Sequence, residues 1–314
     1  MSTVEYNKIV NILGKEDIHF DVIGSPQKEY TVGSIFNPIP NGFYFLVESA
    51  DLGKEAKGSL VLTNTNDVQL PKNTVSLLVE ENPQLVFYKV LSTIFGETST
   101  GCISDLAVVS KEADIGENVQ IDPFAVVGNC VLEDNVIVKS HAVIRDNSIV
   151  KEKTVINEHS SIGASGIAWI WDEDKKEKVV QPQLGGVIIE KQCIIGAHAV
   201  LVRGSLSEYT KIGKHTLIAP GARIGHGTII GPYAHLANDV VTGGNTCIGA
   251  HCFIGSGTVF RPKVKIADQT IVGAGAVVIK NIQEKGKTLM GVPAEAYPTK
   301  NNPSGMPSPF SVNQ

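Results

Sequence analysis

The chain has 314 residues, 42% hydrophobic and 19% charged, which is enough for about two folded domains and too apolar for wholesale disorder. Its 27 basic and 32 acidic residues give a net charge of −5 without a Lys/Arg cluster, which argues against a nucleic-acid-binding protein. No apolar run approaches the ~18 residues of a membrane span and the start has no secretory pattern, so we expect a cytoplasmic protein. Five scattered cysteines without a Cys-x-x-Cys pair predict reduced thiols.

Residues 1–100 contain no repeat and predict a small α/β domain, interpreted as a nucleotide-binding domain. Two segments have the pattern of helices, residues 4–13 and residues 83–95. The second begins at Asn82–Pro83, an N-cap followed by proline at the first helical position. Three segments between the helices predict strands: Phe43–Val47, Ser59–Thr63 and Val75–Val79.

Residues 101–281 are dominated by an aliphatic residue that returns every sixth position. From Ile212 to Val278, eleven of the twelve positions in this register are large and apolar, and Thr242 is the exception. Shorter runs keep the same period: Ile189 to Leu201, and Ile115 to Ile162 with one five-residue step. This period is neither that of a helix nor that of an ordinary strand, and it is the signature of a parallel β-helix.

In such a fold each hexapeptide forms one short strand and a turn, and three hexapeptides form one triangular coil. Residues 18 apart in the sequence therefore stack on each other. The aliphatic side chain points inward, and the Gly or Ala that often follows it relieves crowding at the corner. Knowledge of the class, rather than the spacing, supplies the hand. The predicted fold class is mainly β: a left-handed parallel β-helix with a small N-terminal α/β domain.

Two segments depart from the repeat. Residues 164–186 contain Trp169, Trp171 and the charged run Asp172–Lys178, and we expect a loop that leaves one corner of the β-helix. Residues 282–314 predict a C-terminal cap and a flexible tail, with the tail beginning after Pro293.

The hexapeptide run resembles the left-handed β-helix acyltransferases. Residues 1–280 resemble the UDP-3-O-acylglucosamine N-acyltransferases of lipid A synthesis, and the stretches that carry this resemblance are Gly42–Val47, Glu81–Pro83, Ile162–Gly166 and Pro182–Gly186. Residues 224–298 look more like the acetyl-CoA-dependent nucleotide-sugar N-acetyltransferases, through Ile224–His226, Tyr233–His235, Val272–Asn281 and Gly291–Ala294.

The chain also departs from both patterns. The lipid A family is expected to hold uracil between two aromatic rings; Phe45 fits the first position, but the second corresponds to Asp51. A second active-site histidine of that family is replaced by Arg261–Pro262–Lys263. The acidic residue that often follows the catalytic histidine of the acetyltransferases is replaced by Gly227.

The resemblance implies an N-acyltransferase that moves an acyl group, most simply acetyl, from CoA to the amine of a nucleotide-linked amino-deoxysugar. His226 lies between two glycines that leave room for both reactants, and a neutral imidazole is a suitable base near pH 7. Gly244, 18 residues further on, is expected to offer its N–H to the thioester oxygen. Phe45 is expected to stack on the nucleobase, His235 to contact substrate, and Ala274 with Gly244 to bind CoA.

Other readings stay open at this stage. The same fold could serve lipid A synthesis with a hydroxyacyl carrier protein as the donor, or bind a sugar nucleotide without catalysis. The γ-class carbonic anhydrases share the β-helix, but His226, His235 and His251 are spaced too irregularly for their zinc site, so we expect no metal. Five other histidines occupy outward corner positions, where 18-residue spacing should stack His141 on His159, and the family implies a homotrimer; the corner histidines are His141, His159, His198, His215 and His251.

Overall fold

The computed structural model describes residues 2–47, 52–65 and 68–299. The chain divides into two compact units, Met1–Glu97 and Thr98–Gln314, which are described separately below. No helix in these described ranges is long and apolar enough to cross a membrane.

The N-terminal unit is a six-stranded mixed sheet, in the order β1-β3-β4-β5-β6-β2, with two α-helices. Its elements are β1 (Thr3–Glu5), α1 (Tyr6–Lys15), β2 (Phe20–Ile23), β3 (Glu29–Val32), β4 (Gly42–Leu46), a 3-10 turn (Lys54–Ala56), β5 (Leu60–Thr63), β6 (Val75–Val79) and α2 (Pro83–Phe95). Helix α2 begins as predicted, because the Asn82 side chain accepts the N–H groups of Gln84 and Leu85. The first helix was predicted two residues too early, since residues 3–5 pair with β3 instead.

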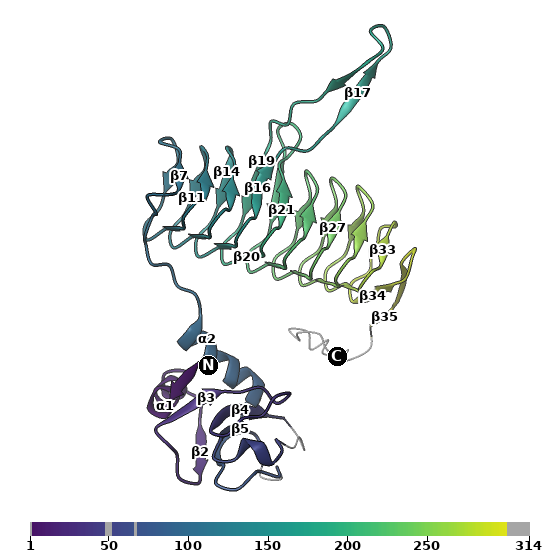
Figure 1. The fold of residues 1–314 in the computed structure, drawn as a ribbon. Helices are drawn as coiled ribbons and strands as arrows, with labels where there is room; N and C mark the ends of the chain where they lie inside the picture. The colour runs from purple at the N-terminus through teal and green to yellow at the C-terminus, as the bar shows by residue number, and fades with distance from the viewer. Residues whose placement is uncertain (1, 48–51, 66–67, 300–314) are drawn as a thin grey trace. The chain divides into compact units, whose positions relative to one another are not determined.

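The second unit is a parallel β-helix whose successive strands belong in turn to three sheets (Figure 1). The nine-stranded sheet contains β7 (Val108–Val109), β10 (Val126–Val127), β13 (Val143–Ile144), β16 (Ser161–Ala164), β21 (Val200–Val202), β24 (Arg223–Ile224), β27 (Val241–Thr242), β30 (Val259–Phe260) and β33 (Val277–Val278). The eight-stranded sheet contains β8 (Asp114–Ile115), β11 (Val131–Leu132), β14 (Ser148–Val150), β19 (Gly186–Ile189), β22 (Tyr209–Ile212), β25 (Ile229–Ile230), β28 (Cys247–Ile248) and β31 (Lys265–Ile266).

The ten-stranded sheet completes each coil and closes the C-terminal end. It contains β9 (Gln120–Ile121), β12 (Ile137–Val138), β15 (Val155–Ile156), β20 (Ile194–Ile195), β23 (Leu217–Ile218), β26 (His235–Leu236), β29 (Phe253–Ile254), β32 (Ile271–Val272), β34 (Lys287–Met290) and β35 (Glu295–Pro298). Strand β34 adds to the last coil in parallel, and β35 folds back on it. Residues 295–298 are therefore a strand, although the sequence placed them in a flexible tail; residues 300–314 lie outside the described part of the chain.

The predicted register of inward side chains is confirmed. Ile218 pairs with Leu236 and Ile224 with Thr242, each 18 residues apart, and all four side chains are buried. The five-residue step is accommodated within one coil, where Ile121 pairs with Val138, 17 residues away. Thr242 is tolerated inside because its Oγ1 accepts the Gly225 N–H at 2.9 Å.

Both insertions leave the β-helix at the same edge, between the nine-stranded and the eight-stranded sheet, which we call the site edge. The first insertion carries the antiparallel hairpin of β17 (Trp169–Asp172) and β18 (Glu177–Val180), which extends away from the coils in Figure 1. The predicted loop is thus an ordered hairpin, on which Lys178 Nζ lies 4.5 Å from the Trp169 ring. The second insertion, residues 203–208, lengthens the next coil so that Leu201 pairs with Ile224.

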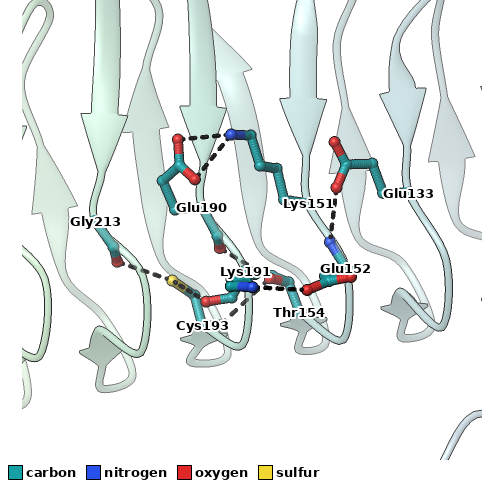
Figure 2. Close-up of polar contacts among 8 residues, drawn as sticks. All are labelled: Glu133, Lys151, Glu152, Thr154, Glu190, Lys191, Cys193 and Gly213. Atoms are coloured by element: carbon teal, nitrogen blue, oxygen red, sulfur yellow. Dashed lines mark hydrogen bonds and ion pairs between the residues drawn. The ribbon is translucent and has the colours of Figure 1, made fainter.

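Ion pairs stack the coils on either side of the first insertion (Figure 2). Lys151 Nζ lies 2.9 and 2.8 Å from the two Glu190 oxygens, and Lys191 Nζ lies 3.1 Å from Glu152 Oε1. Each pair joins residues 39 apart in the sequence. The carboxylate of Glu190 raises the pKa of Lys151 through this hydrogen bond, so the ammonium is the favoured form.

Outward aromatic side chains also stack from coil to coil. The predicted contact between His141 and His159 is confirmed, with parallel rings 4.8 Å apart. His198 continues the stack across the first insertion, at 4.9 Å from His159. These histidines have φ angles near +60°, the left-handed conformation that turns the chain at a corner.

The five cysteines are free thiols. Three are buried in the β-helix, where burial raises the pKa of Cys130 and of Cys252 to about 12 and that of Cys193 to about 11. These three behave as small core residues rather than as nucleophiles.

Neighbouring isoleucines in β20 test the inward register. Ile195 is fully buried and Ile194 is 45% exposed. We expect Ile195→Ala to lower the free energy of unfolding by about 2–5 kcal/mol, because it leaves a cavity inside the β-helix. Ile194→Ala should cost less than about 1 kcal/mol. Denaturant unfolding of both variants measures the difference; equal losses would contradict the register.

Candidate functional site

His226 lies at the site edge, in the turn between β24 and β25, and the backbone around it is held at three points. The Gly225 N–H donates to Thr242 Oγ1, and the Gly227 N–H donates to Thr210 Oγ1, both at 2.9 Å. The His226 carbonyl accepts the Asn245 N–H at 2.7 Å. Gly227 has a φ of 64°, and a Cβ there would overlap the Asn245 side chain, which accounts for glycine at this position.

The half-buried imidazole of His226 has a partner that the sequence did not predict. Its Nδ1 lies 3.0 Å from Ser205 Oγ, in the second insertion. Glu208 shapes that insertion by accepting the Ser205 N–H at 2.7 Å and the Leu206 N–H at 3.0 Å. The backbone N–H groups, Leu206 first, lower the pKa of Glu208, and the nearby His226 imidazole lowers it further.

Ser205 and Glu208 therefore supply the orienting group that is absent at Gly227. The signal that could have located them is the step from Leu201 to Ile212, which is eleven residues where two hexapeptides would need twelve and so breaks the register. A break of this kind predicts a loop at a corner, but it does not say which of the loop's side chains turns back toward His226.

The two insertions are joined at their bases. The Leu184 N–H donates to the Ser205 carbonyl, and the Gly185 N–H donates to the Gly204 carbonyl, both at 3.0 Å. Gly204 and Gly185 are fully buried, and a Cβ on Gly204 would overlap the Glu208 carbonyl. The segment that presents Ser205 to His226 is thus held from both sides, by Glu208 and by the base of the hairpin.

Gly244 adjoins His226 as predicted, one coil further along the site edge. A Cβ at Gly244 would overlap the imidazole, and the nearest ring atom would be Nε2. Within the described residues the Gly244 N–H has no hydrogen-bond partner, whereas its carbonyl accepts the Lys263 N–H at 2.9 Å. One side of the site edge therefore presents an imidazole nitrogen and a backbone donor next to each other.

The remaining predicted site residues do not join this pair within one chain. His235 lies in β26 of the ten-stranded sheet, half-buried against Phe253 at a ring distance of 5.2 Å, and burial lowers its pKa. Ala274 follows β32 of that same sheet, at another corner. A β-helix places different sheets on different sides, so these residues can share a site with His226 only through a second chain.

Phe45 belongs to the N-terminal unit. Its ring packs against Phe87 and Tyr88 of α2, at centroid distances of 5.2 and 5.9 Å. Tyr88 is 51% exposed, so it supplies a second aromatic ring beside Phe45 that the sequence interpretation overlooked. Asp51, the position where that ring was sought, lies outside the described residues. Three or more side chains placed to hold a metal ion are found nowhere in the described ranges.

Comparison with known proteins agrees with this architecture. Residues 112–146, 209–244 and 245–280 match the bacterial transferase hexapeptide (six repeats) family. The fold and these matches define a left-handed β-helix protein with the hexapeptide repeats of acyltransferases.

Among such proteins the chain resembles the UDP-3-O-acylglucosamine N-acyltransferase of Coxiella burnetii. The proteins of strain Dugway 5J108-111 and strain RSA 493 are each 39% identical to it over 194 residues, which are 52% of this chain and 55% of the relative. The chain therefore spans about half the length of the curated relatives it matches.

Solved structures show the same fold. UDP-N-acetylglucosamine O-acyltransferase from Moraxella catarrhalis is 24% identical with a TM-score of 0.56, covering 62% of this chain and 73% of that one. The UDP-N-acetylglucosamine acyltransferase of Francisella novicida is 25% identical with a TM-score of 0.55, covering 63% and 70%.

Glu208→Gln tests whether this carboxylate stabilises the second insertion. The folded pKa of Glu208 lies below its ordinary value of 4.5, so its stabilisation is complete above that value and is lost as the pH falls through the folded pKa. We expect the variant to melt below the wild type from pH 7 down to about 5, and the gap to close in more acidic solution. Thermal unfolding across this range measures the gap; a gap that grows on acidification would contradict the assignment.

Proposed function

We propose that the protein is an N-acyltransferase that transfers an acyl group from a thioester to the amine of a nucleotide-linked amino-deoxysugar. One observation carries the proposal: His226 is held by Ser205 through Nδ1 while its Nε2 adjoins Gly244, on a fold similar to curated UDP-3-O-acylglucosamine N-acyltransferases. Imidazole nitrogen and backbone N–H are the two groups that amide formation from a thioester needs.

In the proposed reaction the amine nitrogen attacks the thioester carbonyl carbon and His226 Nε2 takes a proton from the nitrogen. For Nε2 to be free as an acceptor, Nδ1 carries the ring proton and donates it to Ser205 Oγ. The Gly244 N–H stabilises the negative oxygen of the tetrahedral intermediate. The C–S bond then breaks and the departing thiolate receives the proton from the imidazolium, so no acyl-enzyme is formed.

Other parts of the proposal concern binding and assembly. Phe45, with Tyr88 beside it, stacks on the nucleobase of the acceptor. His235 contacts the acceptor, and Ala274 binds the donor CoA through its backbone, as Gly244 does. Since His235 and Ala274 lie away from the His226 side of the β-helix, we propose a homotrimer in which a neighbouring chain supplies them to each His226.

His226→Ala tests the proposed base. We expect a fall in kcat of about 10²–10⁴-fold with little change in donor affinity, because a general base acts on the transition state. Ser205→Ala should lower kcat less, since the imidazole remains. His159→Ala is the matched control, an outward histidine in the same β-helix, and should keep wild-type turnover. Thiol release from acetyl-CoA with UDP-amino sugars measures each rate; normal turnover in His226→Ala would remove it from the mechanism.

A second candidate differs in the donor. The curated relatives support a longer hydroxyacyl group carried by acyl carrier protein, and the acceptor named in their activity is UDP-3-O-acylglucosamine. In this chain the last coil is covered by the β34–β35 hairpin, and the described residues contain no helix after β33 to which a carrier protein could dock.

We therefore expect acetyl-CoA to be used in preference to hydroxymyristoyl carrier protein. A competition assay with the two donors at equal concentration, followed by mass spectrometry of the acylated sugar nucleotide, decides the matter. A hydroxymyristoyl amide as the main product would make lipid A synthesis the better assignment.

A further inference from the structure

A second chemical feature lies beside His226, on the outer face of the eight-stranded sheet. An open pocket of about 590 Å³ is bordered by Glu208 and Gly227 at the site edge and by three lysines, Lys211, Lys263 and Lys265. The site described above uses none of these lysines.

The register of the coils fixes where the lysines stand. Lys211, Ile229, Cys247 and Lys265 occupy equivalent positions on four successive strands. With ~4.8 Å between paired strands, Lys211 and Lys265 are about 14 Å apart at their backbones. The half-exposed Ile229 and the partly exposed Cys247 form an apolar floor between them.

Lys263 connects this pocket to the site edge. Its N–H donates to the Gly244 carbonyl, and the Asn245 N–H in turn donates to the His226 carbonyl. Lys263 is thus two coils from His226, or about 10 Å at the backbone. Lys265 follows two residues later in β31, so two ammonium groups reach the same end of the pocket.

The charges of the three lysines are not neutralised by neighbours. Within the described ranges none of them forms an ion pair, whereas Lys151, Lys191, Lys285 and Lys287 each have a carboxylate partner. Glu208 is the one carboxylate that lines the pocket, and its oxygens already accept two backbone N–H groups. The pocket therefore presents an excess of positive charge next to the imidazole.

We propose that Lys211, Lys263 and Lys265 bind the diphosphate of the sugar nucleotide that reacts at His226, an inference that rests on the proposed function. Phosphate oxygens are the acceptors that clustered ammonium groups recognise. Both candidate substrates contain a diphosphate, but the reacting amine of a sugar nucleotide is only a few bonds from it. In CoA the whole pantetheine arm intervenes between sulfur and phosphate, which fits a distance of two coils less well.

Calorimetric titration of the full chain with UDP and, separately, with CoA tests this assignment. We expect Lys263→Gln combined with Lys265→Gln to weaken UDP binding about tenfold or more, and added salt to weaken UDP binding by the wild type. CoA affinity should be unchanged. Lys111→Gln combined with Lys153→Gln removes the same charge from exposed positions elsewhere on the β-helix and should alter neither titration. Equal unfolding midpoints for both double variants confirm that each is folded.

Three results would overturn the assignment: no UDP binding by the wild type, equal UDP affinity in the wild type and Lys263→Gln/Lys265→Gln, or a loss confined to CoA, which would give the pocket to the donor. Its failure is distinguishable from failure of the proposed function. Lysine-dependent UDP binding together with no acyl transfer by the wild type would refute the acyltransferase while leaving the phosphate site in place. His226→Ala should bind UDP normally, because the imidazole does not contact the diphosphate.

Discussion

The hydrogen-bonded spacing of about 4.8 Å between successive coils is the constraint on which the rest of this molecule depends. Every inward aliphatic side chain has to fill the same cross-section as the one before it, so the sequence must return to the same chemistry after each full coil. Residues far apart in the chain are thereby brought to fixed neighbouring positions. His226, Gly244 and Lys263 stand on successive coils for this reason, and their order along the site edge follows from counting residues.

Variation in the chain is concentrated where this constraint is weakest. Strand residues are fixed by pairing on both sides, whereas a corner needs only to connect two strands. Both insertions occupy the same edge, and the second brings Ser205 to the His226 ring. The interior accommodates the site as well: Thr242 replaces an aliphatic residue, and its hydroxyl anchors the Gly225 N–H beside the imidazole. The one polar break in the long inward register is thus part of the scaffold of the site.

The period of six was sufficient to predict the β-helix, its inward residues and the neighbouring positions of His226 and Gly244, because these depend only on counting. Ser205 and Glu208 were missed because loop conformation depends on hydrogen bonds such as Glu208 to the Leu206 N–H, which have no periodic signature. Tyr88 was missed for a related reason: it lies on α2, and its approach to Phe45 follows from how a helix packs on a sheet. Strand β1 is only three residues long and pairs with β3, so the chain around it shows no alternation to detect.

The stacked histidines reveal a consequence of building by coils. His159 and His198 are 39 residues apart, yet their rings meet as closely as those of His141 and His159, which are 18 apart. Viewed from that corner, the hairpin does not exist. A chain of this design can gain or lose long segments at one edge while its other two edges remain unchanged, so surfaces on different sides of the same protein are free to diverge at different speeds. The edge that holds His226 is the one where this chain has acquired its own features, and the histidine stack lies on an edge that has kept the plain repeat.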